Sequence, residues 1–209
     1  MLLLLGKTTA SLPDIDALLS RLPAQWISAW EARHGATHRK SNTIGVRQSL
    51  GGLLLLAESG AIGELHYEDS GKPHLSISTS DFSITHTDGL VLCAIEHRTD
   101  GGLPHVGIDA ENLTRVATQP FERLAARWFT EGELAQFSAS PDSETFARIW
   151  TRKEAMVKYQ GAGLSKLHDA DTACNDQSRT GFTEYREGEI IITLCHDTTT
   201  PPPYEIKYC

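Results

Sequence analysis

The chain has 209 residues, 40% hydrophobic and 22% charged, which is an ordinary globular composition and enough length for one large domain or two small ones. Its formal net charge is −8, whereas a protein that binds nucleic acid over its whole surface is basic, so we expect no nucleic-acid partner. The four cysteines form neither a C-x-x-C pair nor a zinc-finger spacing, so we expect reduced thiols in a cytoplasmic protein; they are Cys93, Cys174, Cys195 and Cys209.

The leucine run at the start of the chain, residues 2–5, predicts a buried first strand. Gly6 and Lys7 end this run, whereas a secretory signal needs about 7–15 apolar residues and a transmembrane helix about 20. No later segment is long enough to cross a bilayer, so we expect no association with a membrane.

Two helical patterns follow the first strand. Residues 13–34 predict one helix with Asp14 as its N-cap, and Trp26 and Trp30 share a face of it that we expect in the core. A second helix is expected over about residues 41–58. Its Gly51-Gly52 pair is unfavourable for an uninterrupted helix.

The pattern then changes to short strands, which we expect at residues 64–68, 82–85 and 90–96. Residues 70–73, Ser-Gly-Lys-Pro, separate the first two strands. Asp88-Gly89 separates the last two and predicts a tight hairpin.

A short linker is expected at residues 100–104, whose sequence is Asp-Gly-Gly-Leu-Pro. It divides the chain into an N-terminal lobe, residues 1–102, and a C-terminal lobe, residues 103–209. Helices and strands occur in both lobes, although no residue-level repeat is visible. We therefore predict an α+β fold built from two similar α+β lobes.

The C-terminal lobe begins with a strand and ends with several. Three helices lie between them, and Gly161 and Gly163 end the last helix. The expected elements are a strand at 106–109, helices at 119–129, 131–137 and 143–160, strands at 181–186, 190–194 and 204–208, and a turn at 187–189.

Asp109 and Glu111 lie two residues apart at the end of an apolar strand, so their side chains point to the same face. Two close carboxylates repel each other unless a proton or cation lies between them. Oxygen ligands suit a hard divalent ion such as magnesium. Two solvated acids at a strand end are the alternative interpretation.

A second group of charges lies on the helix expected at residues 143–160. Trp150, Glu154 and Lys158 follow each other at four-residue spacing and therefore share one face. A third carboxylate and an ammonium on this face can meet the strand acids across a cleft. By spacing alone, an ordinary surface salt bridge between Glu154 and Lys158 is the favoured explanation.

The third group lies in the N-terminal lobe. His86 follows Thr85 at a strand end before a tight turn, a setting in which a histidine can bind phosphate. Lys72 adds a cation on a turn and Arg47 adds one on a helix. Considered singly, the histidine is more often structural, and Lys72 and Arg47 are ordinary surface residues.

In combination, four motifs resemble the 4′-phosphopantetheinyl transferases of the surfactin-synthetase-activating type. Their order and approximate spacing match that family over residues 71–164, and the layout of helices and strands extends the resemblance over most of the chain. The motifs are Gly71-Lys72-Pro73, Phe82-Ser83-Ile84-Thr85-His86, Gly107-Ile108-Asp109-Ala110-Glu111, and Trp150-Thr151-Arg152-Lys153-Glu154-Ala155 with Lys158 and Gly161-Ala162-Gly163-Leu164.

The resemblance implies a pseudo-dimer of two lobes in one chain, with coenzyme A bound between them. It implies that Asp109, Glu111 and Glu154 hold Mg²⁺, and that Glu154, Lys158 and Asp109 are catalytic. The residues that it implies for binding coenzyme A are Arg47, with Arg39 and Lys40 as alternatives, Lys72, Thr85, His86, Lys153 and Lys158.

The implied reaction is attack by a carrier-protein serine on the β-phosphorus of coenzyme A, which yields holo carrier protein and adenosine 3′,5′-bisphosphate. Two positions depart from the family pattern. Thr85 replaces a serine, and its hydroxyl can make the same hydrogen bond. Ala110 replaces a bulkier residue, but its side chain points away from the two acids, so we expect an effect on packing only.

The implied partner is an apo acyl, peptidyl or polyketide carrier protein, and a monomer is expected. Carrier proteins are acidic, so their contact surface on this chain should be apolar or basic. Arg123, Arg127, Trp128 and Phe129 are our candidates for it. Two alternatives use the same residues: a magnesium-dependent phosphohydrolase that releases pantetheine phosphate to water, and a non-catalytic coenzyme A-binding module.

Overall fold

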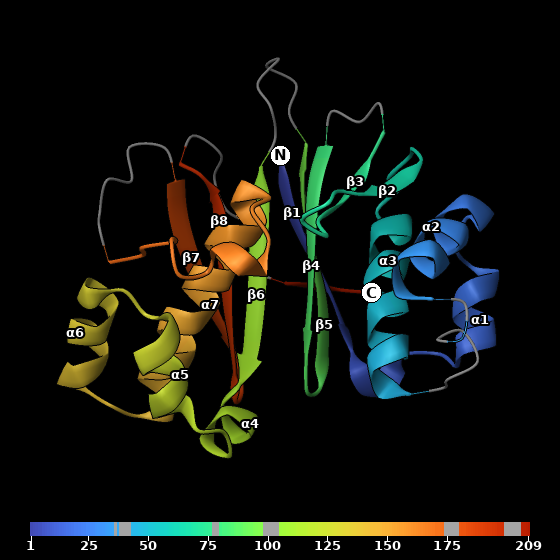
Figure 1. Ribbon diagram of the computed structural model, residues 1–209. Coiled ribbons are helices and arrows are strands. Elements are labelled where there is room, and N and C mark those ends of the chain that lie inside the picture. Colours follow the sequence, from blue (N-terminus) through green and yellow to red (C-terminus); the bar gives the residue numbers. More distant parts are fainter. Residues whose placement is uncertain (36, 38–42, 77–79, 98–104, 174–179, 199–205) are drawn as a thin grey trace. The chain divides into compact units, whose positions relative to one another are not determined.

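Helices and sheets occur together in two structural units of the chain, as the computed structural model shows (Figure 1). Unit 1 comprises Met1–Pro104 and Pro203–Cys209, and unit 2 comprises His105–Pro202. The predicted α+β class is confirmed. The structure describes residues 1–35, 37, 43–76, 80–97, 105–173, 180–198 and 206–209, so the expected linker at 100–104 lies outside the described residues.

Unit 1 is built on a four-stranded sheet in the order β4-β5-β1-β9. The first strand and the Asp88-Gly89 hairpin are confirmed: β4 and β5 pair antiparallel up to Thr87 and Leu90, and Gly89 adopts a φ of 95°. β9 adds to β1 in parallel. The strands are β1 (Leu2–Thr8), β4 (Ser80–Thr87), β5 (Leu90–His97) and β9 (Lys207–Tyr208).

The helix predicted at residues 13–34 is wrong in one respect, because the structure contains two helices there. α1 (Ile15–Ser20) begins at Asp14, whose side chain accepts a hydrogen bond from the Ala17 amide. α2 (Ala24–His34) begins after Pro23. Proline disfavours helical geometry in the residue before it, which explains the break.

α3 (Ile44–Glu58) crosses the Gly51-Gly52 pair without interruption. A Cβ atom on Gly52 would lie 2.3 Å from a methyl carbon of Ile84, and one on Gly51 would lie 2.7 Å from Leu12. The two glycines therefore allow close packing of α3 rather than a helix break. The core of unit 1 also includes Trp26 and Trp30, which are buried as expected.

A two-stranded hairpin completes unit 1. β2 (Leu65–Tyr67) pairs antiparallel with β3 (Pro73–Leu75), a strand that the sequence pattern did not reveal. The turn between them contains Gly71 at a φ of 92° and Lys72.

Unit 2 contains a three-stranded antiparallel sheet in the order β6-β8-β7. Its longest helix, α7, packs on β6 and β8, and Figure 1 shows it running along the sheet. The tight turn between β7 and β8 is confirmed, with Gly188 at a φ of 58°. The strands are β6 (Val106–Asn112), β7 (Thr180–Glu187) and β8 (Ile190–Asp197).

α7 (Ser143–Gln160) has the predicted bounds. It is capped by the Asp142 side chain and ends at Gly161, which adopts the left-handed conformation with a φ of 65°. One short helix was not predicted: α4, which begins after the N-cap Asn112. The other helices are α4 (Leu113–Ala117), α5 (Phe121–Trp128), α6 (Glu131–Ala139) and the 3-10 turn η3 (Leu164–Lys166).

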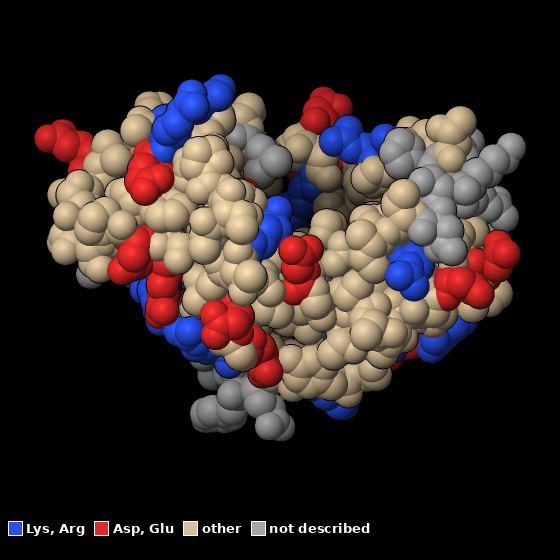
Figure 2. Space-filling model, turned by 90° about the horizontal axis from the view of Figure 1, so that it is seen from below, with Lys and Arg blue, Asp and Glu red and all other residues tan. Residues whose placement is uncertain are grey.

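The surface carries charges of both signs. In Figure 2, lysine and arginine side chains alternate with aspartate and glutamate in small groups over the described part of the face. None of the helices in the described residues has the length and apolar character needed to cross a membrane. Among the described residues, Cys93, Cys195 and Cys209 form no disulfide, and Cys174 lies outside the described residues.

Candidate active site

The strand motif and the helix motif of unit 2 meet where α7 packs on β6. The ammonium Nζ of Lys158 lies 2.7 Å from Asp109 Oδ1 and donates a second hydrogen bond of 3.0 Å to the carbonyl of Ile108. Glu154 Oε2 lies 3.9 Å from the same ammonium. The structure therefore brings together Asp109 and the two charged residues of α7 that sequence spacing placed on one face.

Asp109, Glu111 and Glu154 form what we call the acidic cluster. Asp109 is only 4% exposed. Burial raises the pKa of Glu154 to about 8, with a further contribution from the charge of Asp109 that Lys158 partly offsets. Burial also raises the pKa of Glu111, against a lowering effect of its hydrogen bond with Arg115. Both shifts therefore come mainly from burial and in part from the closeness of the three carboxyl groups.

Lys158 supplies positive charge inside the acidic cluster. Burial alone would lower the pKa of this ammonium, but the nearby carboxylates, chiefly Asp109 and then Glu154, more than compensate and raise it. Lys158 therefore stays protonated at neutral pH and compensates part of the cluster's charge.

The donor chemistry of the acidic cluster fits magnesium. As the described residues stand, no three Asp, Glu, His or Cys side chains are gathered into a ligand set for a metal ion. Magnesium, however, keeps several water ligands and is commonly bound through one or two carboxylates together with substrate phosphates. Burial is the main cause of the raised pKa values of Glu154 and Glu111, and the charge of Asp109 adds to it; a divalent cation at these carboxylates would favour their charged forms.

Trp150 supports Glu154 from one turn earlier on α7. Its side chain hydrogen-bonds to the Glu154 carboxyl and lowers the pKa of that group slightly against the larger effect of burial. The ring of Trp150 stacks on Phe146, with ring centroids 5.5 Å apart. The stacking on Phe146 thus fixes the position from which Trp150 contacts the Glu154 carboxyl.

Lys153, which the resemblance placed among the coenzyme A-binding residues, points elsewhere. Its side chain is fully buried, and its ammonium hydrogen-bonds to Glu133 at 2.8 Å and to the carbonyl of Ala170. A buried and fully engaged ammonium is not accessible to a ligand, so this expectation is corrected.

Unit 1 contains a cavity of about 350 Å³ beside the exposed His86. It lies at the N-terminal end of α3, where unpaired backbone N–H groups favour anions. We call it the His86 pocket; its lining residues are Trp30, His34, Thr43, Gly45, Val46, Ser49 and His86. Sequence reasoning did not identify His34, which carries no motif; its ring contacts that of Trp30 in a tilted arrangement, with ring centroids 5.1 Å apart.

Thr85 does not share the His86 pocket. Because side chains alternate along β4, Thr85 points to the face opposite His86, and it is buried. Its side chain and that of His86 are therefore not brought together.

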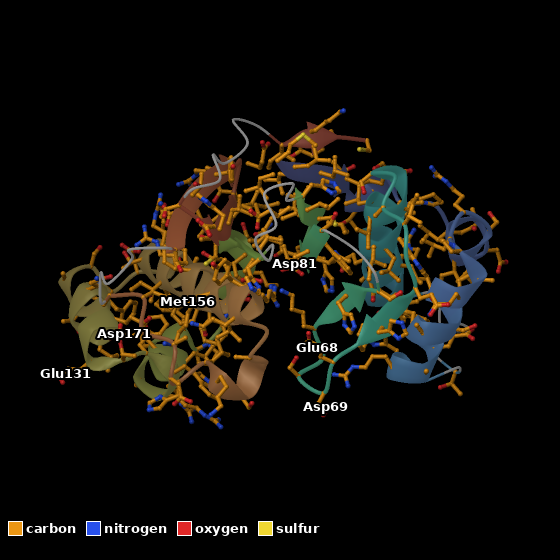
Figure 3. All side chains as sticks on the ribbon, turned by 90° about the horizontal axis from the view of Figure 1, so that it is seen from above. Glu68, Asp69, Asp81, Glu131, Met156 and Asp171 are labelled. Atoms are coloured by element: carbon orange, nitrogen blue, oxygen red, sulfur yellow. The ribbon has the colours of Figure 1, made fainter. Side chains whose placement is uncertain are left out.

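The other predicted cations of unit 1 have different surroundings. Lys72 forms an ion pair of 2.7 Å with Asp81, which lies on β4 and is labelled in Figure 3. The Nε of Arg47 is buried and has no hydrogen-bond partner among the described residues. Such a donor favours an acceptor supplied by a ligand. Arg39 and Lys40, the alternatives to Arg47, lie outside the described residues.

A larger cavity of about 710 Å³ in unit 1 was not predicted from sequence. It lies between α2 and β2 and reaches Glu68 and Asp69, which Figure 3 labels at the hairpin. Arg33 and Tyr67 line it, and burial raises the pKa of Tyr67 to about 12 against the opposing charge of Arg33.

The expected carrier-binding surface is only partly accessible. The Arg127 guanidinium lies 4.9 Å from the centre of the Trp128 ring and covers it. Phe129 is 3% exposed and packs with Phe137 and Phe146 in the core of unit 2. Phe129 is thus excluded from a surface role, whereas Arg127 remains on the surface.

Comparison with known proteins identifies related chains. The family model of the 4′-phosphopantetheinyl transferase superfamily matches residues 105–209, which include the acidic cluster and Lys158. The 4′-phosphopantetheinyl transferase HetI of Nostoc sp. is 34% identical over 179 residues, or 81% of this chain and 70% of HetI. AcpT of Salmonella typhi is 28% identical over 78% of this chain and 81% of AcpT. Sfp of Bacillus subtilis is 28% identical over 68% of this chain and 60% of Sfp.

Proposed function

Because this chain belongs to the 4′-phosphopantetheinyl transferase superfamily and transfers phosphopantetheine to apo carrier proteins, we propose that it does so as a magnesium-dependent enzyme of the holo-[acyl-carrier-protein] synthase type. We place its reacting centre at the acidic cluster and Lys158. The observation that carries this assignment is the hydrogen bond of 2.7 Å between Lys158 and Asp109. It joins the strand motif to the helix motif, so that the charges needed for phosphoryl-type transfer lie together.

Asp109, Glu111 and Glu154 would hold the magnesium ion. When bound, the ion supplies neutralisation of the negative charge on the pyrophosphate of coenzyme A. The all-oxygen donor set and the closeness of the three carboxyl groups, of which Asp109 and Glu111 both raise the pKa of Glu154, support this role.

Glu154 is the proposed proton acceptor. The serine hydroxyl of the carrier forms a bond to the β-phosphorus, the bond from that phosphorus to the bridging oxygen breaks, and adenosine 3′,5′-bisphosphate leaves. The serine proton passes to the Glu154 carboxylate, directly or through a water. The position of its carboxyl in the acidic cluster, 3.9 Å from the Lys158 ammonium, supports this role, because a general base must lie within reach of the reacting hydroxyl.

Lys158 is the proposed partner of the leaving phosphate. Its ammonium is held by the Ile108 carbonyl and by Asp109, which fixes its position before substrate binds. A positioned charge stabilises the leaving group without the cost of reorganisation at the moment of reaction.

The nucleotide end of coenzyme A is proposed to bind through residues of unit 1. The His86 pocket combines an exposed histidine with a helix N-terminus, which suits the ribose 3′-phosphate. Arg47 has a buried N–H group for which a phosphate oxygen is the natural acceptor. Lys72 would exchange its contact with Asp81 for one with the nucleotide.

The decisive experiment is the intact mass of an apo acyl carrier protein after incubation with this chain, coenzyme A and magnesium. We expect a gain of one phosphopantetheine group, and none with Asp109→Ala or in the presence of EDTA. An equal gain with EDTA would contradict the magnesium dependence.

The same assay separates the two alternatives. Release of pantetheine phosphate without carrier modification would favour a phosphohydrolase. Binding of coenzyme A with neither product, over a panel of fatty-acid, polyketide and peptidyl carriers, would favour a binding module. We further propose a cytoplasmic monomer, which sedimentation of the purified chain and cell fractionation would test.

A further inference from the structure

The residue that precedes Glu154 on α7 is part of a buried ion pair. Lys153 and Glu133 are both fully buried, and Lys153 Nζ lies 2.8 Å from Glu133 Oε2. The ammonium also donates to the Ala170 carbonyl. Both charges are therefore held entirely by protein groups.

Glu133 in turn is held by three other donors. Its Oε2 accepts from the amide of Thr130 at 2.9 Å, which completes the capping box of α6. Its Oε1 accepts from the amide and the hydroxyl of Thr172, at 2.9 and 2.7 Å. Asp171, labelled in Figure 3, accepts from the hydroxyl of Thr130 at 2.9 Å. The ion pair thus ties α7 to the start of α6 and to residues 170–172.

This attachment determines which way α7 is turned about its own axis. Successive residues of an α-helix point about 100° apart, so a fixed direction for Lys153 fixes the direction of Glu154 as well. Lys153 points to α6, and Glu154 and Lys158 point to Asp109 on β6. The active-site residues cannot turn away from Asp109 without breaking the buried pair.

Stability alone does not account for such a pair. Apolar residues of similar size often replace a buried ion pair with no loss of stability, because desolvation offsets the attraction between the charges. The pair does, however, permit only one arrangement in which all its donors and acceptors are satisfied. Replacing the pair also removes the acceptor of the Thr130 and Thr172 donors, which costs stability, so the effect of the pair on the precision of α7 is measured by the kinetics of the folded variant.

We propose that Lys153 and Glu133 are positioning residues for catalysis, and that their ion pair holds α7 at the rotation that presents Glu154 and Lys158 to the reacting groups. This inference rests on the proposed function of the acidic cluster. A displacement of about 1 Å at a reacting centre lowers rates by about 100-fold, so a small rotation of α7 is sufficient to impair the reaction.

The test is the double variant Glu133→Leu/Lys153→Met, which removes both charges at similar side-chain volume. We expect a lower melting temperature, because the Thr130 and Thr172 donors lose their acceptor. In the folded variant, assayed below its melting temperature, we expect a KM for coenzyme A within about twofold and a kcat at least about tenfold lower. The matched control is Lys7→Met/Glu58→Leu, which removes a partly buried ion pair of unit 1 and should retain the wild-type kcat.

Wild-type kcat in a folded double variant would overturn the inference while leaving the proposed function intact. Absence of transfer by the wild-type chain would overturn both. If the double variant does not fold, Thr172→Val decides, because it removes one hydrogen bond to Glu133 and keeps both charges. A kcat about threefold lower at unchanged KM supports the inference, and an unchanged kcat overturns it.

Discussion

A Cβ atom on Gly107 would lie 1.9 Å from the carbonyl oxygen of Ala155, so the backbones of β6 and α7 are in direct contact at this point. The amide nitrogen of Tyr159 would lie 2.5 Å from the same atom. Gly107 precedes Asp109 by two residues, and Ala155 follows Glu154. This backbone contact therefore determines how closely the strand acids approach the charged face of α7.

Gly107→Ala is expected to separate β6 from α7. No flexible side chain can move aside, because both obstructing atoms belong to the backbone. We expect a loss of about 3 kcal/mol or more in the free energy of unfolding, measured by urea denaturation, and a kcat at least about 100-fold lower. Gly45→Ala is the control for stability, since its Cβ would meet nothing within 4 Å and alanine favours a helix. Equal stability of the two variants would contradict the close contact.

Glu154→Gln is expected to abolish transfer and to weaken coenzyme A binding much less. Glutamine keeps the size of the side chain but cannot accept the serine proton, and loss of a general base lowers kcat by about 10²–10⁴-fold. Rates come from the mass assay and affinity from titration calorimetry. A fully active variant would exclude Glu154 as the base.

The raised pKa of Glu154 predicts a pH-dependent stability in the absence of metal. Folding raises this pKa from 4.5 to about 8, so the folded state binds the proton more tightly than the unfolded state. The effect on stability is absent below pH 4.5, becomes increasingly unfavourable up to about pH 8, and is constant above that.

Relative to Glu154→Gln, the free energy of unfolding of the wild type should fall by at most about 1.4 kcal/mol for each pH unit in this window. Urea denaturation of both proteins at pH 5 and pH 8 with EDTA measures the difference. Parallel pH profiles of stability for the two proteins would show that folding does not raise the pKa of the Glu154 carboxyl.

His86→Ala is expected to weaken the binding of coenzyme A without affecting the binding of 3′-dephospho-coenzyme A. If the His86 pocket binds the 3′-phosphate, the variant loses a charge-assisted hydrogen bond to it. The KM for coenzyme A should then rise about tenfold, and the KM for 3′-dephospho-coenzyme A should stay the same. His66→Ala, which changes an exposed histidine outside this pocket, is the control. An equal loss for both substrates would place the 3′-phosphate elsewhere.

Arg47→Met is expected to weaken coenzyme A binding and to leave the stability of the protein nearly unchanged. The buried Nε has no partner among the described residues, so its removal should change the free energy of unfolding by less than about 1 kcal/mol. The rise in melting temperature produced by saturating coenzyme A should become smaller. An unchanged rise would exclude a contact between Arg47 and the ligand.

Elements defined by local chemistry could be predicted from sequence. The bounds of α7 follow from the cap Asp142 and the stop Gly161, and the two hairpin turns follow from glycines that tolerate positive φ. Other features were missed. The helix boundary at Pro23 has a local signal that the helical pattern outweighed, whereas the three-residue strand β3 is defined by its pairing with β2.

The sequence by itself therefore determined the α+β class, most of the helices and strands, and the charged face shared by Trp150, Glu154 and Lys158. Only the tertiary structure decided that Lys153 turns into the core while Glu154 turns to Asp109, and that Phe129 is buried. Caps, turns and helical spacing act between near neighbours, so a sequence displays them directly. The direction of an individual side chain depends on partners such as Glu133 and the Ala170 carbonyl, which only the folded chain brings within hydrogen-bond distance.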